Sequence, residues 1–226
     1  MTDPGIRFDG VECTVDGERV LHDVDLRLSA ARTAVIGANG SGKSTFARML
    51  NGLRAPTSGR ATVLGYDVSR DARALRDRVG FVFTNPEAQI LMPTAAEDVA
   101  LSLRGLPRAQ RAERVHETLS RFGLESRGDQ PASSLSGGQR QLLAIASVLA
   151  TEPDLVVADE PTTLLDLRNA QRIGDLLLSL DAPVVIVTHD LDLAAACDEV
   201  VLFDEGRVRG VGEPDDVIDA YRRLVA

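Results

Sequence analysis

A glycine-rich stretch in the first quarter of the chain has the composition of a phosphate-binding loop. Residues 37–44 read Gly-Ala-Asn-Gly-Ser-Gly-Lys-Ser and fit the pattern G-x-x-x-x-G-K-[ST]. Glycines let the backbone approach a phosphate without a Cβ in the way, and successive N–H groups at a helix N-terminus attract anions. Lys43 would add a full charge near the β- and γ-phosphates, and Ser44 would offer a hydroxyl to Mg²⁺. The candidate binding residues are Gly37, Asn39, Gly40, Ser41, Gly42, Lys43, Ser44 and Thr45.

The segments on either side favour a binding loop over a glycine-rich turn that binds nothing. Residues 33–36 are apolar and rich in β-branched side chains, which predicts a buried strand. Residues 45–50 are typical of a helix. Strand, glycine loop and helix form the structural context that the motif requires.

Two adjacent carboxylates follow an apolar stretch late in the chain. Residues 155–158 read Leu-Val-Val-Ala, which predicts a strand, and Asp159 and Glu160 come directly after it. Ligands of a parallel sheet lie beyond the carboxyl ends of its strands. Asp159 is therefore placed to hold Mg²⁺ through water, and Glu160 to polarise an attacking water beside the γ-phosphate. The alternative is two acids on a solvated loop.

Two further motifs would complete a phosphate site. Residues 135–139 read Leu-Ser-Gly-Gly-Gln and open a predicted helix over 139–149, so they offer a hydroxyl, two glycines and a helix N-terminus to an anion. Taken alone, this motif is a helix cap. His189 follows a predicted strand at 183–187 and would reach the γ-phosphate, although a lone histidine in such a place is usually structural. The candidates in the first motif are Ser136, Gly137, Gly138 and Gln139.

The elements that must position these residues alternate in type. Residues 6–28 alternate apolar and polar side chains around Asp-Gly at 16–17, which predicts antiparallel β structure, and residues 60–68 are expected to extend that sheet. From 94 to 149 the pattern is helical throughout, with a polar helix at 107–122. This indicates an α/β chain with an all-helical insertion. The other predicted elements are helices at 71–78, 169–180, 190–197 and 214–225 and strands at 79–83 and 199–203.

Composition excludes several classes of protein. The chain has 226 residues, 44% of them hydrophobic, which suits one large domain or one domain with an inserted subdomain. A net charge of −9 disfavours nucleic-acid binding and direct attraction to anionic lipid, so we expect any membrane contact to run through protein partners. The N-terminus lacks the features of a signal peptide, and no apolar run approaches the ~18–20 residues of a spanning helix. Cys13 and Cys197 have no metal-ligand spacing and are expected to be buried.

With these motifs in order, the chain resembles the ATP-binding subunit of ABC transporters over nearly its full length. Residues 37–44 match the Walker A motif, 135–139 the ABC signature, and 155–160 Walker B with its catalytic Glu160. Leu-Leu-Asp at 164–166 matches the D-loop, and His189 matches the switch histidine.

The resemblance implies fold and cofactors. The expected fold is a P-loop NTPase with a RecA-like parallel sheet, an N-terminal antiparallel β subdomain and an inserted α-helical subdomain. A single ABC ATPase domain would span 1–226, with the ATP-binding core in 1–84 and 150–226 and the helical subdomain in 85–149. The cofactors would be ATP and Mg²⁺, with Ser44 and Asp159 at the metal.

A finer resemblance is to the energy-coupling-factor ATPases, which power uptake of vitamins and transition-metal ions. It rests on Asn-Pro-Glu-Ala-Gln-Ile at 85–90 and Glu-Asp-Val-Ala at 97–100, and the short tail after Glu213 is similar to the biotin and cobalt/nickel branch. Biotin is the first expectation and cobalt or nickel the second. The resemblance implies a head-to-tail homodimer or heterodimer at the cytoplasmic face of the membrane, bound to a transmembrane coupling protein beside a membrane substrate-binding protein. Each ATP would lie between one subunit's Walker A and the other's signature.

The chain departs from the family pattern at three places. Thr84 stands where a glutamine is usual, which puts γ-phosphate sensing there in doubt, and Val15 stands where an aromatic usually stacks on adenine, which would relax base selectivity. The D-loop, 162–166, carries threonine and leucine where smaller residues are common.

Three other functions remain open. They are an ABC protein without a transporter, a regulatory nucleotide-binding module that hydrolyses little ATP, and an export ATPase. ABC proteins without a transporter usually have two ATPase units or a long coiled coil, and this sequence shows neither. Only residues 85–100 weigh against an export ATPase.

Overall fold

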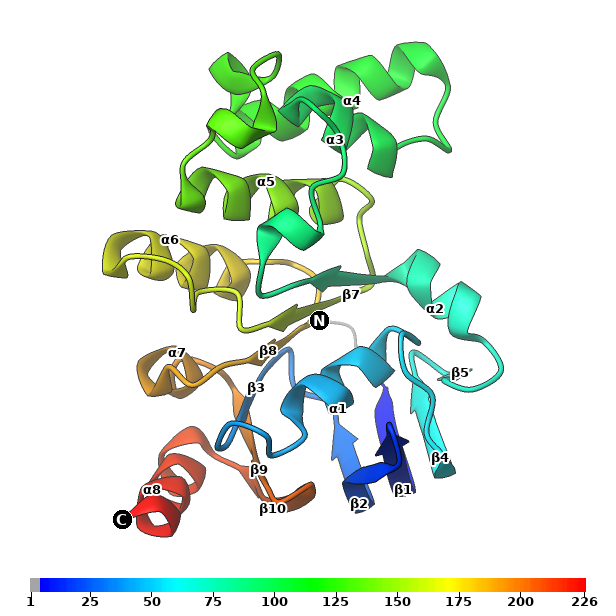
Figure 1. Ribbon diagram of the computed structural model, residues 1–226, viewed down its shortest axis with the longest axis vertical. Coiled ribbons are helices and arrows are strands. Elements are labelled where there is room, and N and C mark those ends of the chain that lie inside the picture. Colours follow the sequence, from blue (N-terminus) through cyan, green and yellow to red (C-terminus); the bar gives the residue numbers. More distant parts are fainter. Residues whose placement is uncertain (1–4) are drawn as a thin grey trace.

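A six-stranded sheet forms the centre of the molecule. The structure is a computed structural model that describes residues 5–226. The strand order is β10-β9-β3-β8-β7-β6, in which neighbouring strands from β9 to β6 run parallel and β10 pairs antiparallel with β9 (Figure 1). The strands are β3 (Arg32–Ile36), β6 (Val79–Val82), β7 (Leu155–Asp159), β8 (Val184–Val187), β9 (Glu199–Asp204) and β10 (Arg207–Gly212).

A second, antiparallel sheet packs beside the first. Its order is β2-β1-β4-β5, and Asp16 and Gly17, both with positive φ, make the turn between β1 and β2. Polar and buried positions alternate along β1, as one face of a sheet on a core requires. The strands are β1 (Ile6–Val15), β2 (Glu18–Leu28), β4 (Ser58–Val63) and β5 (Tyr66–Asp67). The predicted antiparallel structure at 6–28 and 60–68 is confirmed.

Helix α1 (Lys43–Leu50) lies between the two sheets. Its Phe46 ring is 5.1 Å from that of Phe8 in β1 and 5.2 Å from that of Phe203 in β9, measured between centroids. These rings are fully buried in a cluster that also contains Cys13. The helix that follows the glycine loop is thus fixed on both sides, which holds its N-terminus in place.

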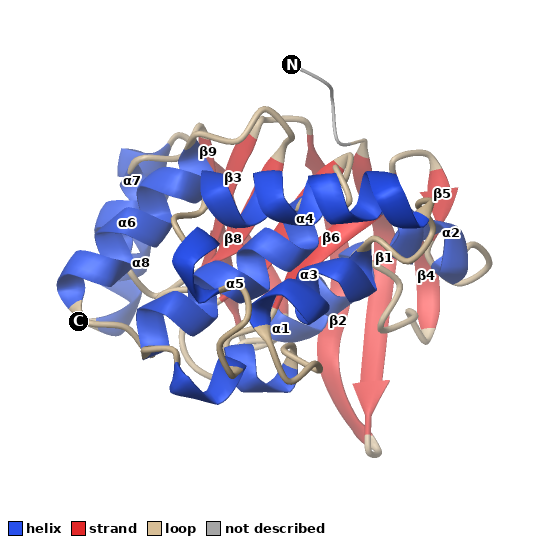
Figure 2. Ribbon diagram, turned by 90° about the horizontal axis from the view of Figure 1, so that it is seen from above, coloured by secondary structure: helices blue, strands red, loops and turns tan. Residues whose placement is uncertain are grey.

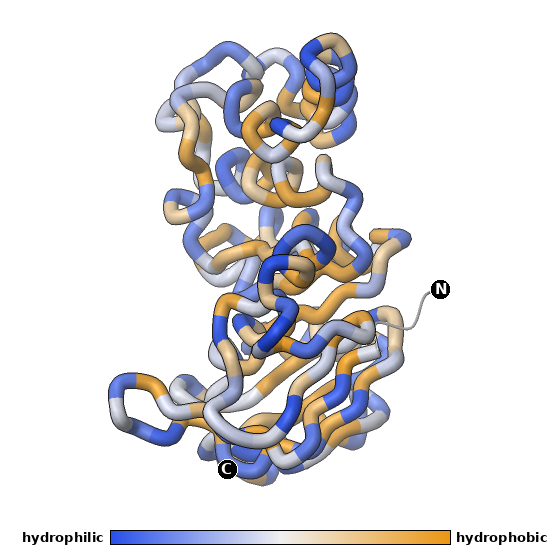
Figure 3. The backbone as a smooth tube through the Cα atoms, turned by 90° about the vertical axis from the view of Figure 1, so that its right-hand side faces the viewer, coloured by the Kyte–Doolittle hydropathy of each residue, from blue (hydrophilic) through white to orange (hydrophobic). Residues whose placement is uncertain are grey.

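The opposite face of the central sheet is covered by helices. The cluster there joins sheet residues such as Ile186 to Leu143 and Ile173 of the helices, and it also contains Cys197. Figure 3 shows hydrophobic stretches both in the helical part of the tube and in the part that contains the sheets. These helices are α5 (Gly137–Leu149), α6 (Leu167–Leu178), α7 (Leu191–Ala195) and α8 (Pro214–Val225), and α2 (Ala72–Arg78) precedes β6.

The segment between β6 and β7 is helical, as predicted. It contains α3 (Ala95–Ser102), α4 (Arg108–Arg121) and α5, with short 3₁₀ turns and one isolated β-bridge between Thr94 and Pro131. These helices lie at the end of the molecule farthest from the antiparallel sheet (Figure 1), and from that end they stand in front of the strands (Figure 2). Thr94 and Glu97 form the predicted capping box of α3. Within residues 5–226, no helix combines the length and apolarity needed to cross a membrane.

Some predicted boundaries differ from the structure. Strand β10 was not predicted, because its apolar positions alternate with arginine and glycine and none of its residues is buried. Helix α7 is shorter than predicted and ends at Ala195. Helix α1 begins at Lys43 rather than at residue 45, since the last residues of the glycine loop already belong to its first turn.

Candidate nucleotide-binding site

The glycine loop connects β3 to α1 and closes around a cavity of about 220 Å³. Gly37 has φ 143°, and a Cβ there would come within 2.0 Å of the Phe203 carbonyl oxygen, so only glycine fits. Glu160, from the end of β7, faces the same cavity. The other lining residues are Val20, Asn39, Gly40, Ser41, Gly42, Lys43, Ser44 and Thr45.

Backbone hydrogen bonds from distant segments hold the loop. The Ser41 amide donates to the Ala38 carbonyl at 3.2 Å, and the Gly206 amide donates to the Ser41 carbonyl at 3.1 Å. The His22 amide in turn donates to the Gly206 carbonyl at 2.9 Å. The β9–β10 turn therefore ties the loop to β2.

Lys43 lies inside the loop. Its Nζ donates to the carbonyl oxygens of Gly37 at 2.7 Å and of Ala38 at 2.9 Å. Burial lowers the pKa of the Lys43 ammonium, while the negative charges of Glu160 and Asp159 act in the opposite direction. The loop thus carries a cation beside its backbone N–H groups, which suits an anionic ligand.

Ser44 and Asp159 meet at the entrance of α1. The Ser44 hydroxyl donates to Asp159 Oδ1 at 2.9 Å. The pKa of Asp159 is raised by burial, and the hydrogen bond from Ser44 offsets only part of that rise. A hydroxyl and a carboxylate oxygen at this spacing fit Mg²⁺, which prefers oxygen ligands and retains several waters. Thr84 donates its hydroxyl to the Asp159 carbonyl at 2.8 Å, so it lies against the end of β7.

Glu160 is held by two donors. Its backbone has φ 52°, in the left-handed region that non-glycine residues rarely occupy. Its Oε2 lies 2.7 Å from His189 Nδ1 and accepts a hydrogen bond from the Thr163 hydroxyl, also at 2.7 Å. Because an ionised carboxylate only accepts, the hydrogen-bonded proton belongs to Nδ1. No motif in the sequence points to this role of Thr163.

The signature residues cap a helix elsewhere. Ser136 is the N-cap of α5 and exchanges hydrogen bonds with Gln139, and both Ser136 and Gly137 are exposed. Gly138 packs against Asn169 of α6 so closely that a Cβ would lie 2.6 Å from its side chain. Of the described residues, none from 135–139 lines the cavity of the glycine loop. Within one chain the structure does not bring the signature to that cavity.

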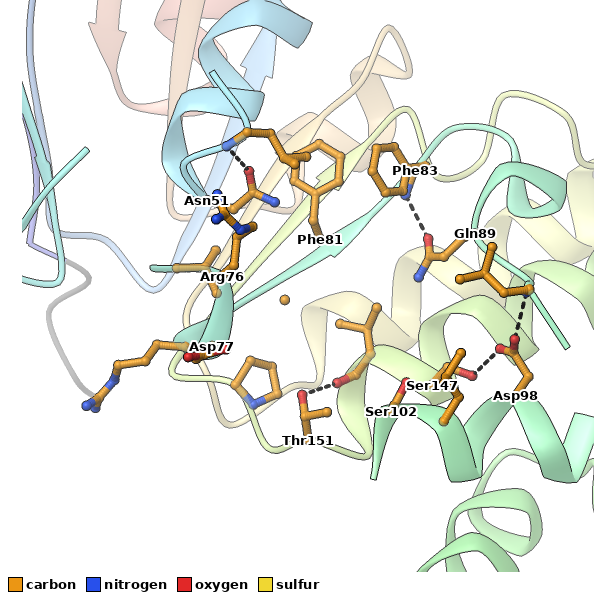
Figure 4. Close-up of a pocket in the computed structure, with 18 residues that line it drawn as sticks. Asn51, Arg76, Asp77, Phe81, Phe83, Gln89, Asp98, Ser102, Ser147 and Thr151 are labelled. Atoms are coloured by element: carbon orange, nitrogen blue, oxygen red, sulfur yellow. Dashed lines mark hydrogen bonds between the residues drawn. The ribbon is translucent and has the colours of Figure 1, made fainter. Parts of the chain in front are cut away.

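A second cavity, of about 330 Å³, opens between the β6 end of the central sheet and helices α3 and α5 (Figure 4). Leu53 and Leu91 line it and are 46% and 71% exposed. Asp98 also lines it and accepts hydrogen bonds from the Leu91 amide and the Ser147 hydroxyl. The cavity therefore combines exposed apolar side chains with hydrogen-bonded polar groups.

Gln89 links the two sides of this cavity. Its Oε1 accepts from the Phe83 amide at 3.1 Å, and its Nε2 donates to the Ala144 carbonyl of α5 at 3.1 Å. A glutamine amide thus joins the end of β6 to the helix that carries the signature.

Known proteins share this fold and these motifs. The family profile described as ABC transporter matches residues 21–163. The biotin transport ATP-binding protein BioM of Rhizobium etli is 40% identical over 223 residues, which are 98% of this chain and 99% of that protein. The energy-coupling factor transporter ATP-binding protein EcfA1 of Lacticaseibacillus paracasei is 39% identical over 216 residues, 92% of this chain and 78% of that protein.

The similarity extends to a solved structure. CbiO1 from Clostridium perfringens, described as part of the ABC transporter complex cbiONQ, superposes with a TM-score of 0.85 at 33% identity, over 99% of this chain and 93% of that one. The predicted family and the P-loop NTPase fold are confirmed, and the family is one of ATP-hydrolysing enzymes. The chain belongs to the ABC transporter ATP-binding family, among relatives that include energy-coupling-factor ATPases.

Proposed function

We propose that this chain hydrolyses ATP to energise uptake of a vitamin or metal ion, with biotin as the substrate, through an energy-coupling-factor transporter. The observation that carries the hydrolytic part is the convergence of the glycine loop and Glu160 on one cavity. Biotin is supported by the 40% identity to BioM. Cobalt or nickel is the alternative that the resemblance in sequence implies.

In this proposal each polar side chain of the cavity has one task. Lys43 leaves the loop carbonyls to contact the β- and γ-phosphates, a small movement because its ammonium already lies within the loop. Ser44 and Asp159 would hold Mg²⁺, which would supply charge neutralisation at the phosphates. Glu160 accepts the proton of the attacking water, and His189 positions Glu160 through the 2.7 Å contact.

We further propose that the active form is a head-to-tail dimer, homomeric or heteromeric. The signature residues Ser136 and Gly137 are exposed at the N-terminus of α5, where N–H groups and the helix dipole favour an anion. They do not line their own chain's cavity, so a second ATPase subunit would supply them. The γ-phosphate would then be bound from both chains, and its loss would open the dimer.

The cavity of Figure 4 is the proposed contact with a membrane partner. The proposal divides the chain into an ATP-binding core, 1–84 and 150–226, and a helical subdomain, 85–149, and the cavity lies where they meet. The exposed Leu53 and Leu91 would receive an amphipathic helix of a transmembrane coupling protein, itself joined to a substrate-binding membrane protein. The chain would thus work at the cytoplasmic face of the membrane.

Two measurements test the proposal. In the purified chain, Lys43→Ala is expected to weaken ATP binding, and Glu160→Gln to keep binding and lower turnover on the order of 10²–10⁴-fold. Near-normal turnover of Glu160→Gln would remove Glu160 from the base role, and unchanged affinity of Lys43→Ala would refute the phosphate loop.

The transport part is tested on the assembly. The tagged chain is purified from gently solubilised native membranes, and the complex is assayed for binding of labelled biotin and of Co²⁺ or Ni²⁺. A coupling protein with a small biotin-binding subunit supports the proposal, and a metal-binding one moves it to the alternative. A conventional permease pair, an exporter or no membrane partner overturns it.

A further inference from the structure

We propose that Thr163 is a positioning residue for ATP hydrolysis, which holds the Glu160 carboxylate together with His189. This inference rests on the proposed role of Glu160 as the base. Thr163 lies in the D-loop, where smaller residues are common in the family, and its hydroxyl would then act on the Glu160 carboxylate of the same chain.

The two donors occupy one oxygen of the carboxylate. The Thr163 hydroxyl and His189 Nδ1 both lie 2.7 Å from Glu160 Oε2. Among the hydrogen bonds of residues 5–226, none ends on Glu160 Oε1, although the residue lines the cavity of the glycine loop. Oε1 is therefore the oxygen left to accept a proton from water.

The backbone fixes the distance between Thr163 and Glu160. Glu160 leaves β7 in the left-handed conformation, and the Thr163 amide donates to the Glu160 carbonyl at 3.4 Å, which closes a tight turn. Pro161 and Thr162, the central residues of the turn, are buried. The turn consequently places the hydroxyl of Thr163 next to the carboxylate of Glu160.

The choice of threonine has a physical reason. Its branched Cβ restricts χ1, so its hydroxyl stays aimed at Oε2 with little loss of side-chain freedom. The His189 side chain is 60% exposed, so water can replace the histidine contact if the ring turns away. Thr163 supplies a donor that remains when His189 moves.

The effect on kinetics follows from this placement. Without the hydroxyl, the Glu160 carboxylate keeps one anchor and samples more orientations, and fewer of them present Oε1 to water. The contacts with nucleotide proposed for Lys43 and Ser44 do not involve Thr163 and are expected to be unchanged. Hence turnover falls while ATP binding does not, which a structural role for Thr163 in the fold would not produce.

The test compares five forms of the full chain with the wild type in steady-state ATP hydrolysis and in ATP binding. Thr163→Val removes the donor at constant shape, and its kcat is expected to fall about tenfold, as for loss of a hydrogen bond to a charged group, with KM unchanged. Thr163→Ser keeps the donor and is expected to restore at least about half of the turnover. Thr57→Val, at an exposed threonine whose hydroxyl donates to the Glu12 carbonyl, is the matched control and is expected to match the wild type. Glu160→Gln and the Thr163→Val/Glu160→Gln double variant are expected to have the same residual turnover.

Failure of the inference differs from failure of the proposed function. If Thr163→Val turns over ATP within about twofold of the wild type while Glu160→Gln is strongly impaired, Thr163 has no positioning role and Glu160 keeps its own. Equal losses for Thr163→Ser and Thr163→Val, or a further loss in the double variant, would also overturn the inference. If Glu160→Gln hydrolyses ATP normally, the proposed function itself fails.

Discussion

Replacing Gln89 by leucine removes the amide that joins the end of β6 to α5. Gln89 is half-buried and makes two hydrogen bonds of 3.1 Å, from the Phe83 amide and to the Ala144 carbonyl. Leucine has a similar volume and neither donor nor acceptor, so the substitution deletes the link without opening a large cavity.

The loss of stability depends on whether the two backbone groups that bonded to Gln89 find other partners. The Phe83 amide follows the last residue of β6 and loses its partner in a half-buried place, which costs about 1–3 kcal/mol. The Ala144 carbonyl lies within α5, where the helix's own i+4 amide also reaches it, so its loss is small. We expect the free energy of unfolding to fall by about 1–2 kcal/mol.

The assay has two readouts. Urea unfolding measures the stability, and ATP turnover measures whether α5, which carries the signature, keeps its orientation relative to the sheet. Turnover is measured under conditions where the variant is fully folded, and it is expected to fall there although no protein is lost to unfolding. Gln130→Leu, at a glutamine that bonds only to nearby Arg127 and Ser126, is the control and should leave turnover unchanged.

Two outcomes of the Gln89→Leu experiment would contradict this prediction. If Gln89→Leu changes the free energy of unfolding by less than about 0.5 kcal/mol, the Phe83 amide has another partner and the magnitude above is wrong. If stability falls but turnover does not, Gln89 stabilises the fold without orienting α5.

Two further predictions concern packing. Gly138→Ala places a Cβ 2.6 Å from the Asn169 side chain and is expected to lower the free energy of unfolding by about 1–3 kcal/mol. Gly137→Ala is the control, because a Cβ there has no atom within 4 Å, and it should not lower that free energy. Equal urea midpoints for the two variants would contradict the contact between α5 and α6. Burial raises the pKa of the Cys197 thiol to about 12 and also raises that of Cys13. Neither thiol is therefore expected to react with iodoacetamide at neutral pH until the chain unfolds, and labelling of the folded protein detected by mass spectrometry would show that a thiol is accessible.

The fold was largely predictable because its elements have strong local signals. Strand β8 is an unbroken apolar run, typical of a parallel strand buried on both faces, and the capping box at Thr94 marks the start of α3. Strand β10 has no such signal. It forms because β9 offers a free edge, which is a tertiary cause that a local pattern does not contain.

The candidate site was predictable in its members but not in their contacts. The motif of the glycine loop and the strand before Asp159 predict which side chains approach one another, and Ser44 lies 2.9 Å from Asp159. The hydrogen bond from Thr163 to Glu160 depends on the left-handed backbone of Glu160. Glutamate does not favour that conformation, so the residue types of this segment do not predict it.

The ties that hold the glycine loop have a consequence for the energetics of the ATP cycle. Through Gly206, the β9–β10 turn fastens Ser41 to β2, so the loop is preorganised by the folded chain and not by its ligand. Binding then costs little conformational entropy in the loop, and the free energy of the phosphate contacts is not consumed by ordering it. In the proposed dimer, that free energy remains available for drawing a second chain onto the nucleotide, the step that would be coupled to transport.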